Sequence, residues 1–156
     1  CGEGYWVLRW TEQGMQARGC DFSKNVIKIA KDNAISRGLP SSIFESRSIY
    51  DVDKSIDSAD LLVCCEVLEH LEDPEAGLRA LQGIPTQHLI FSVPREPLWR
   101  VLNLARGKYI TQLGNTPGHI QHWSKRSFMQ MISKYFEIVE SSAPLPWTML
   151  LCRPLK

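Results

Sequence analysis

Short apolar runs alternate along the chain with segments whose apolar residues recur at helical spacing. Strands are predicted for four of these runs: 16–20, 43–49, 59–65 and 88–93. The run 59–65 is almost continuously apolar, which is typical of a central parallel strand that is buried on both faces. Strands that alternate with helices in this way predict βαβ units and a parallel sheet.

Polar residues at the ends of the intervening segments predict where the helices begin. Ser23 is expected to cap a helix that continues to about Arg37, and Asp73 to cap one that ends near Gly83. A last helix is predicted to start after Ser124 and to end near Tyr135. The final runs, 136–141 and 147–152, are expected to form a closing antiparallel pair.

The segment 94–123 interrupts this alternation. It contains a predicted helix at 97–106 and a turn-rich stretch at 114–118, and an insertion of this size is usually functional. Four basic residues stand in it against one acidic residue: Arg95, Arg100, Arg106 and Lys108 against Glu96. The charges either solvate a helix face or belong to a substrate-facing lid that attracts an anionic or amphipathic acceptor, with Trp99 and Leu102 as apolar contacts.

Composition places the 156 residues in a single domain of ordinary globular character. The net charge of +1 gives no general electrostatic attraction to nucleic acid or anionic membranes, and no apolar run approaches the length of a membrane span. The five cysteines include no C-x-x-C pair, which argues against a thiolate zinc site. Their number and their apolar settings predict reduced thiols and a cytoplasmic location.

The opening CGEGYW holds two glycines, and Asp21 follows Gly4 by 17 positions. Glycine lets the backbone approach a ligand closely because it has no Cβ, and a carboxylate can accept hydrogen bonds from both hydroxyls of a ribose. This spacing is close to that of sites for adenosine-containing ligands, although a surface turn and an unrelated acidic cap would give the same letters.

Four motifs in order resemble class I S-adenosylmethionine-dependent methyltransferases, of the methyltransferase type 11/12-like group. CGEGYW resembles their glycine motif, GCDFS their ribose-binding strand end, ADLLVCCEVLEHLEDP the region around their central strand, and GHIQHW with Phe128 the stretch before their last helix. The resemblance implies an α/β fold with a Rossmann-like, doubly wound, mostly parallel sheet and an antiparallel last strand. It also implies methyl transfer from S-adenosylmethionine to a small-molecule acceptor.

The resemblance further implies which residues bind the cofactor. The two glycines would border its methionine part, Asp21 would hold the ribose, and Phe22 would lie against the adenine. The remaining predicted cofactor contacts are Ser48 and Ile49 at the adenine edge, and Cys65 and Glu66 near the sulfonium, in addition to Gly2 and Gly4.

Histidines supply the candidate bases for an oxygen or nitrogen acceptor. His119 and His122, in the inserted segment, are the predicted catalytic residues, whereas His70 is expected to satisfy a backbone group at a helix start. In an alternative, Glu66, Glu69 and His70 lie on one face of a helix and hold a divalent ion. That pattern resembles metal-assisted RNA 2′-O- and quinone-pathway O-methyltransferases, with His119 as the fourth ligand. The same sequence pattern also occurs in members of the family that bind no metal. The first expectation is therefore a site with no metal.

Members of this family have a strand before the position of Cys1. Residues 1–156 are therefore predicted to form a single S-adenosylmethionine-dependent methyltransferase domain that is N-terminally incomplete, with its first central strand missing. An inactive methyltransferase-like binding module is the main alternative of another class. A nicotinamide-binding domain is a weaker one, because Val7 stands where G-x-G-x-x-G has its third glycine.

Overall fold

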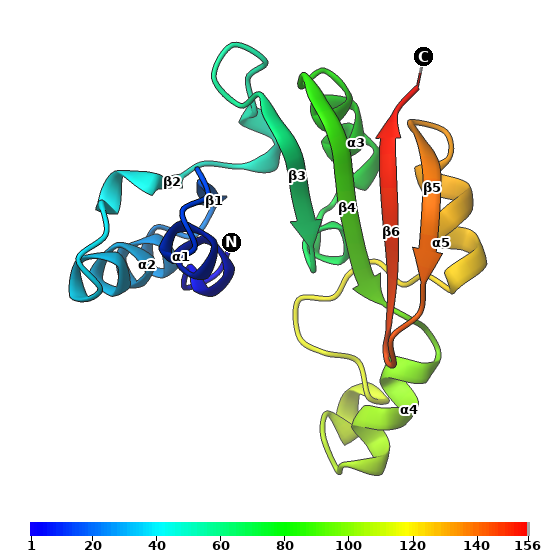
Figure 1. The fold of residues 1–156 in the computed structure, drawn as a ribbon. Helices are drawn as coiled ribbons and strands as arrows, with labels where there is room; N and C mark the ends of the chain where they lie inside the picture. The colour runs from blue at the N-terminus through cyan, green and yellow to red at the C-terminus, as the bar shows by residue number, and fades with distance from the viewer. Residues whose placement is uncertain (156) are drawn as a thin grey trace. The chain divides into compact units, whose positions relative to one another are not determined.

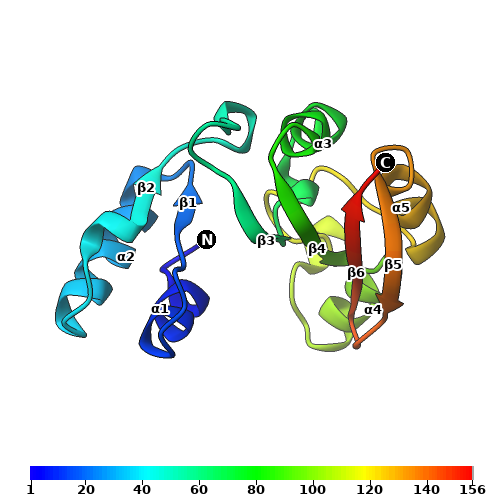
Figure 2. The same ribbon diagram turned by 45° about the horizontal axis from the view of Figure 1, so that its top comes forward.

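The computed structural model describes residues 1–155 and contains two compact units, Cys1–Val52 and a second that begins at Asp53. The first unit contains two helices and two short parallel strands (Figure 2). Its elements are α1 (Tyr5–Glu12), β1 (Gly19–Asp21), α2 (Lys24–Ser36) and β2 (Phe44–Ser46). Gly19 pairs with Phe44 and Asp21 with Ser46, so the strands are in parallel register.

A small core holds the first unit together. It consists of buried apolar side chains from both helices and from β2: Val7, Leu8, Ile27, Ala30, Ala34 and Phe44. Gly4 precedes α1 with a φ of 87°, and a Cβ at this position would lie 2.5 Å from the Phe44 ring. Glycine is therefore required here both by the left-handed backbone and by the close approach of the ring.

The second unit is a four-stranded sheet with the strand order β3-β4-β6-β5 (Figure 1). Its elements are β3 (Ala59–Cys65), α3 (Pro74–Gln82), β4 (Thr86–Pro94), α4 (Leu98–Ala105), α5 (Lys125–Ile132), β5 (Phe136–Ser142) and β6 (Trp147–Pro154). β3 and β4 are parallel, and β6 is antiparallel to both of its neighbours, β4 and β5. The predicted α/β class and the closing antiparallel pair are confirmed.

The core of the second unit lies on one face of its sheet. Leu89 pairs with Cys152 and Phe91 with Leu150, and all four side chains are at most 1% exposed. Figure 1 shows α3 and α5 behind the sheet, and these helices contribute further buried side chains: Leu78, Leu81, Phe128, Met131 and Ile132.

The expectation that 59–65 is buried on both faces is wrong for the described chain. β3 is an edge strand of the sheet, with β4 as its strand partner among the described residues, and Leu61 and Val63 are 44% and 43% exposed. The apolar sequence permits burial on both faces, but burial also needs a covering neighbour. The missing central strand stays a prediction.

The strand predicted at 43–49 is shorter than expected. β2 covers Phe44–Ser46 and lies between 3₁₀ turns at Ser41–Ile43 and Ile49–Asp51. The hydroxyl of Ser48 accepts a hydrogen bond from the main-chain N–H of Tyr50 at 3.3 Å. This local bond favours a turn over continued strand pairing.

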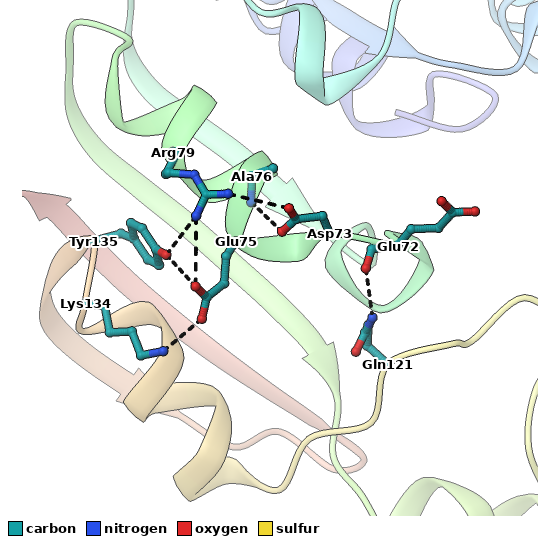
Figure 3. A network of polar contacts seen from close by, with 8 residues as sticks. All are labelled: Glu72, Asp73, Glu75, Ala76, Arg79, Gln121, Lys134 and Tyr135. Atoms are coloured by element: carbon teal, nitrogen blue, oxygen red, sulfur yellow. Dashed lines mark hydrogen bonds and ion pairs between the residues drawn. The ribbon is translucent and has the colours of Figure 1, made fainter.

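All three predicted N-caps are confirmed. Ser23 accepts from Val26 N at 3.4 Å, Ser124 from Ser127 N at 3.2 Å, and Asp73 from Ala76 N at 2.8 Å (Figure 3). The helix after Ser124 ends at Ile132, earlier than its apolar pattern suggested.

A polar network on the surface joins α3 to the residues that follow α5. Glu75 accepts hydrogen bonds from Lys134 Nζ and from the Tyr135 hydroxyl, both at 2.8 Å (Figure 3). Arg79 lies beside the same hydroxyl and also contacts Asp73. These contacts fasten the end of α5 to α3.

The inserted segment lies mostly outside the sheet. Pro94 still belongs to β4, and Arg95 and Trp123 form an isolated bridge at the two ends of the segment. Within it, the buried Asn103 of α4 donates to the Gly114 carbonyl at 2.8 Å, which folds the following turn back onto the helix. Among residues 1–155, none of the helices has the length and the hydropathy of a membrane span.

Candidate functional site

The glycine loop at the start of the first unit is held by one carboxylate. Oδ2 of Asp21 accepts hydrogen bonds from the main-chain nitrogens of Cys1 and Gly2, both at 3.0 Å, and Oδ1 accepts from Ser23 N at 3.1 Å. Partial burial raises the pKa of Asp21, but these hydrogen bonds, the first of them from Ser23, lower it by more, and the net shift is downward. The ionised carboxylate therefore joins the loop to the start of α2.

Both glycines of the loop have a left-handed backbone. Gly2 and Gly4 have φ values of 55° and 87°, and the space around a Cβ at Gly2 is open to 4 Å. Beside Asp21, the ring of Phe22 is 78% exposed, which is unusual for a phenylalanine. The structure therefore brings Gly2 and Asp21 together and leaves an aromatic face open beside them.

A second group of polar side chains lies where β3 ends. Glu66 follows the strand with a φ of 54°, a left-handed backbone that a residue other than glycine rarely adopts. Ser92 Oγ donates to its Oε1 at 2.7 Å, and Trp147 Nε1 donates to its Oε2 at 3.0 Å. Each oxygen of the Glu66 carboxylate is thus held by a different strand.

Glu69 is the least satisfied polar group of this region. Its side chain is 1% exposed, and neither carboxylate oxygen has a partner in hydrogen-bonding geometry. Burial, with a further contribution from the charge of Glu66, raises the pKa of Glu69 to about 8. Burial likewise raises the pKa of Glu66, against the hydrogen bonds from Ser92 and Trp147.

The helix that the metal-binding alternative required after Cys65 is absent. The left-handed Glu66 ends the strand, and residues Leu68–His70 form a single 3₁₀ turn. The tight turn nevertheless brings Glu69 and His70 together with His119. Each of these three side chains offers one potential ligand atom, and the three atoms lie within 4.8 Å of one another. Glu66 is not part of that group, because Ser92 and Trp147 hold its oxygens.

His119 reaches this group because its segment is anchored to the turn. The main-chain N–H groups of Ile120 and Gln121 both donate to the Glu69 carbonyl, at 2.9 and 3.0 Å. Nε2 of Gln121 donates to the main-chain carbonyl of Leu71 at 3.1 Å and lies 3.5 Å from the main-chain carbonyl of Glu72 (Figure 3). Nδ1 of His70 lies 2.9 Å from the Gly118 carbonyl, which can only accept. Nδ1 therefore carries a hydrogen, and in the neutral tautomer of the ring this leaves the lone pair on Nε2.

The two predicted catalytic histidines lie in different surroundings. His119 is 8% exposed and stacks on Trp99 with a centroid separation of 6.0 Å. Burial, together with the nearby His70 and His122, lowers the pKa of His119 to about 4, so its ring is neutral at neutral pH. His122 Nε2 lies 2.9 Å from Arg100 Nη2 and 2.8 Å from Asn115 Oδ1, and burial and Arg100 lower its pKa.

Other predicted site residues have mainly local roles in the described chain. The thiol of Cys65 is partly buried, and burial is the main cause that raises its pKa, so it stays protonated at neutral pH. Ser48 caps the 3₁₀ turn that contains Ile49. Their predicted contacts with a cofactor stay predictions.

Sequence reasoning did not find the partners of Glu66. Ser92 pairs with Cys65 in the parallel register of β3 and β4, so a correct alignment of the two strands would have indicated it. Trp147 is 81 residues from Glu66 in sequence, and no local pattern connects the two.

Comparison with known proteins identifies the family. A methyltransferase domain family matches residues 1–85, which is more than half of the chain. The chain belongs to this methyltransferase family, as the four motifs predicted.

Relatives and solved structures agree with this assignment. The ubiquinone biosynthesis O-methyltransferase of Aliivibrio fischeri (strain MJ11) is 27% identical over 94 residues, which cover 59% of this chain and 40% of that protein. The enzyme of the same name from Alkalilimnicola ehrlichii is 24% identical over 140 residues, which cover 81% and 57%. The matched part therefore spans about 40–57% of the length of these relatives.

Two crystal structures show the same fold at low identity. The PH0226 protein of Pyrococcus horikoshii OT3 superposes with a TM-score of 0.77 at 15% identity, covering 99% of this chain and 80% of that one. Magnesium protoporphyrin IX methyltransferase from Synechocystis PCC 6803, with bound SAH, has a TM-score of 0.74 at 18% identity and covers 99% and 71%. The predicted Rossmann-like fold class is thus confirmed.

Proposed function

We propose that the protein transfers a methyl group from S-adenosylmethionine to a small-molecule acceptor. The observation that carries this proposal is the family match over residues 1–85, which includes both the glycine loop and Glu66. The Aliivibrio and Alkalilimnicola relatives are named as O-methyltransferases of ubiquinone biosynthesis, which favours an oxygen acceptor.

The glycine loop is the proposed binding element for the cofactor. Gly2 leaves open space at its Cα, and the ionised Asp21 is fixed beside it by main-chain hydrogen bonds. Such a carboxylate can accept from ribose hydroxyls, and the exposed Phe22 ring offers a flat apolar face to an adenine. The proposed contacts are those that the sequence predicted.

The protein's contribution to such a transfer is orientation. The sulfonium of the cofactor supplies the reactive methyl group, which moves to the acceptor by in-line displacement. The neutral ring of His119 can accept a hydrogen bond from an acceptor hydroxyl and so hold its oxygen. His122 stays the second predicted base.

The inserted segment supports an anionic or amphipathic acceptor. Val101, Leu104, Ile110 and Leu113 are between 40% and 73% exposed, so the segment presents apolar side chains to solvent. The segment also has more basic than acidic residues, and one of the basic residues, Lys108, is exposed among these apolar side chains. An acceptor with an apolar body and an acidic group would match both features.

Titration calorimetry with S-adenosylmethionine tests the cofactor proposal. Asp21→Ala is expected to weaken binding by about 1.5–3 kcal/mol, because hydrogen bonds to a charged group are lost. Asp32→Ala, at an exposed position of α2, is the matched control and should bind as tightly as the wild type. Equal affinities of the two variants would refute the role of Asp21.

Turnover separates an enzyme from the inactive binding module. Phenolic and carboxylic amphiphiles are the acceptors of choice, and release of S-adenosylhomocysteine is the measurement. Tight cofactor binding without release for any acceptor would favour the binding module.

A second candidate is a metal-assisted O-methyltransferase, and the grouping of Glu69, His70 and His119 favours it. The donor set fits a divalent ion. Burying a carboxylate without a partner is unfavourable, and both oxygens of Glu69 lack one. Carboxylate oxygens and neutral imidazoles suit manganese, and magnesium through its oxygen ligands. Glu69, His70 and His119 would hold such an ion, which would polarise an acceptor oxygen.

Manganese alone is the probe for this candidate. Electron paramagnetic resonance of added Mn²⁺ should show binding that Glu69→Gln weakens by at least about tenfold, since it loses a charged ligand. Glu72→Gln removes a nearby exposed carboxylate and should leave binding unchanged. Absence of Mn²⁺ binding to the wild type would leave the metal-free site that the sequence first predicted.

A further inference from the structure

Glu66, Glu69, His70 and His119 are called the strand-end group below. Trp147 has no role in the proposed function as described so far, yet it contacts Glu66 directly and His119 through Trp99. Its indole N–H donates to Glu66 Oε2, and its ring lies 6.1 Å from that of Trp99. Trp99 in turn stacks on His119, whose ring meets that of His70 edge to face at 4.9 Å. A continuous row of rings thus runs from β6 to the histidines.

The sheet fixes where Trp147 lies. Pro94 pairs with Trp147 and Ser92 with Met149, so the side chains of Ser92 and Trp147 lie on the same face of the β4–β6 pair. Ser92 also pairs with Cys65, the residue before Glu66. Both donors to the Glu66 carboxylate are therefore positioned by strand register and not by a flexible loop.

Glu66 needs such external support because its own backbone is strained. A left-handed conformation of a residue other than glycine persists only when the surroundings hold it. The main-chain N–H of Glu66 donates to the Ser92 carbonyl at 3.0 Å, and the side chain is held by Ser92 and Trp147.

Trp99 has a support of its own within the inserted segment. Its indole N–H donates to Thr116 Oγ1 at 2.9 Å, which ties the start of α4 to the turn before His119. The Trp99 ring is therefore fixed by Thr116 and contacts the rings of both Trp147 and His119. A change in the Trp147 ring would reach His119 through this stack.

We propose that Trp147 is a positioning residue of the methyl-transfer site, which fixes the Glu66 carboxylate through its N–H and the His119 imidazole through the Trp99 ring. The inference rests on the proposed function of the strand-end group. It assigns the last strand, far from the family motifs, a direct part in setting the geometry of that group.

Two variants separate the two contacts. Trp147→Phe keeps an aromatic ring but removes the N–H, whereas Trp147→Leu removes both. Trp123→Phe is the matched control, because Trp123 packs on Phe128 within the same unit. In carbon and nitrogen NMR spectra of the full chain at one fixed pH, Trp147→Phe should move the Glu66 carboxyl signal and leave the His119 ring signals in place. Trp147→Leu should move both, and Trp123→Phe neither.

The Mn²⁺ probe adds a functional measure. If the wild type binds Mn²⁺, Trp147→Leu, which should displace the His119 ring, is expected to weaken binding by about tenfold or more, as loss of a group that orients a metal ligand does. Trp147→Phe keeps the ring and changes only the contact with Glu66, which is not one of the three candidate ligands, so it should leave Mn²⁺ affinity unchanged. If the wild type does not bind it, the metal candidate fails and the NMR signals alone decide the positioning role. A Glu66 carboxyl signal that Trp147→Phe leaves unchanged, or a bound Mn²⁺ whose affinity Trp147→Leu leaves unchanged, would overturn the inference.

Discussion

The glycine loop and the strand-end group are built in different ways. The loop is held within 23 residues of sequence, by main-chain N–H groups that converge on Asp21. The strand-end group draws on four separate segments, from Glu66 and Glu69 to Trp147, 81 residues away. A site made of local backbone contacts depends on a few glycines, whereas an assembled site depends on every element that carries one of its parts.

The largest expected effect concerns the loop. Gly4→Ala places a Cβ 2.5 Å from the Phe44 ring on a left-handed backbone. We expect a loss of about 1–3 kcal/mol in unfolding free energy from overpacking and about 1–2 kcal/mol from the conformation. Denaturant unfolding measures the sum of these two losses in unfolding free energy. Gly14→Ala, with a φ of 85° but open space around its Cβ, should show the conformational loss alone. Equal losses would mean that the Phe44 contact has no importance.

The second prediction concerns β3, the strand that leads into the assembled site. If the sequence is right that a further strand covers it, Val63→Ser in the full protein should lower the unfolding free energy by about 1.5–3 kcal/mol, the value for burying a valine. Val139→Ser on β5 is the control, because Val139 is 49% exposed and Val63 43%. Similar small losses for the two variants would contradict the predicted strand.

A smaller effect is expected at the anchor of the inserted segment. Gln121→Ala removes the hydrogen bond to the Leu71 carbonyl, so we expect a loss of about 0.5–1.5 kcal/mol and faster amide exchange at residues 118–121. Gln112→Ala, in the exposed 3₁₀ turn of the same segment, is the control. Unchanged amide exchange at 118–121 would show that the hydrogen bonds from the Ile120 and Gln121 N–H groups to the Glu69 carbonyl anchor the segment without the Gln121 side chain.

The smallest effect needs no mutation. The insertion 94–123 is proposed to cover the substrate, and its helix α4 has several exposed apolar residues. Hydrogen exchange should be faster in Leu98–Ala105 than in the buried part of β4, with protection rising when cofactor and acceptor are both present. Equal protection of the two segments in the free protein would count against a mobile cover.

The difference between the two regions also explains what the sequence could predict. Helix caps at Ser23, Asp73 and Ser124 were predictable because each rests on one side chain and a backbone group three residues away. The α/β alternation followed from apolar periodicity alone.

The parts that failed or were missed depend on distant neighbours. The burial of β3 depends on what lies beside it, and an apolar run does not reveal that. The helix expected after Cys65 gave way to a left-handed Glu66 that Ser92 and Trp147 hold from other strands. His119 was found as a candidate, but its stacking on Trp99 and its anchoring to Glu69 are tertiary contacts without a local signal.

The anchoring of residues 118–121 on the turn at 69–72 has a consequence for how such a protein can diverge. The Glu69 carbonyl fixes the incoming chain just beyond His119, so the position of the histidine does not depend on the length of the segment before it. Residues 104–113 can therefore be lengthened, shortened or exchanged while Trp99 and the imidazole that stacks on it keep their places. New acceptors could be acquired through this segment by insertion and deletion, without any change in the predicted base His119.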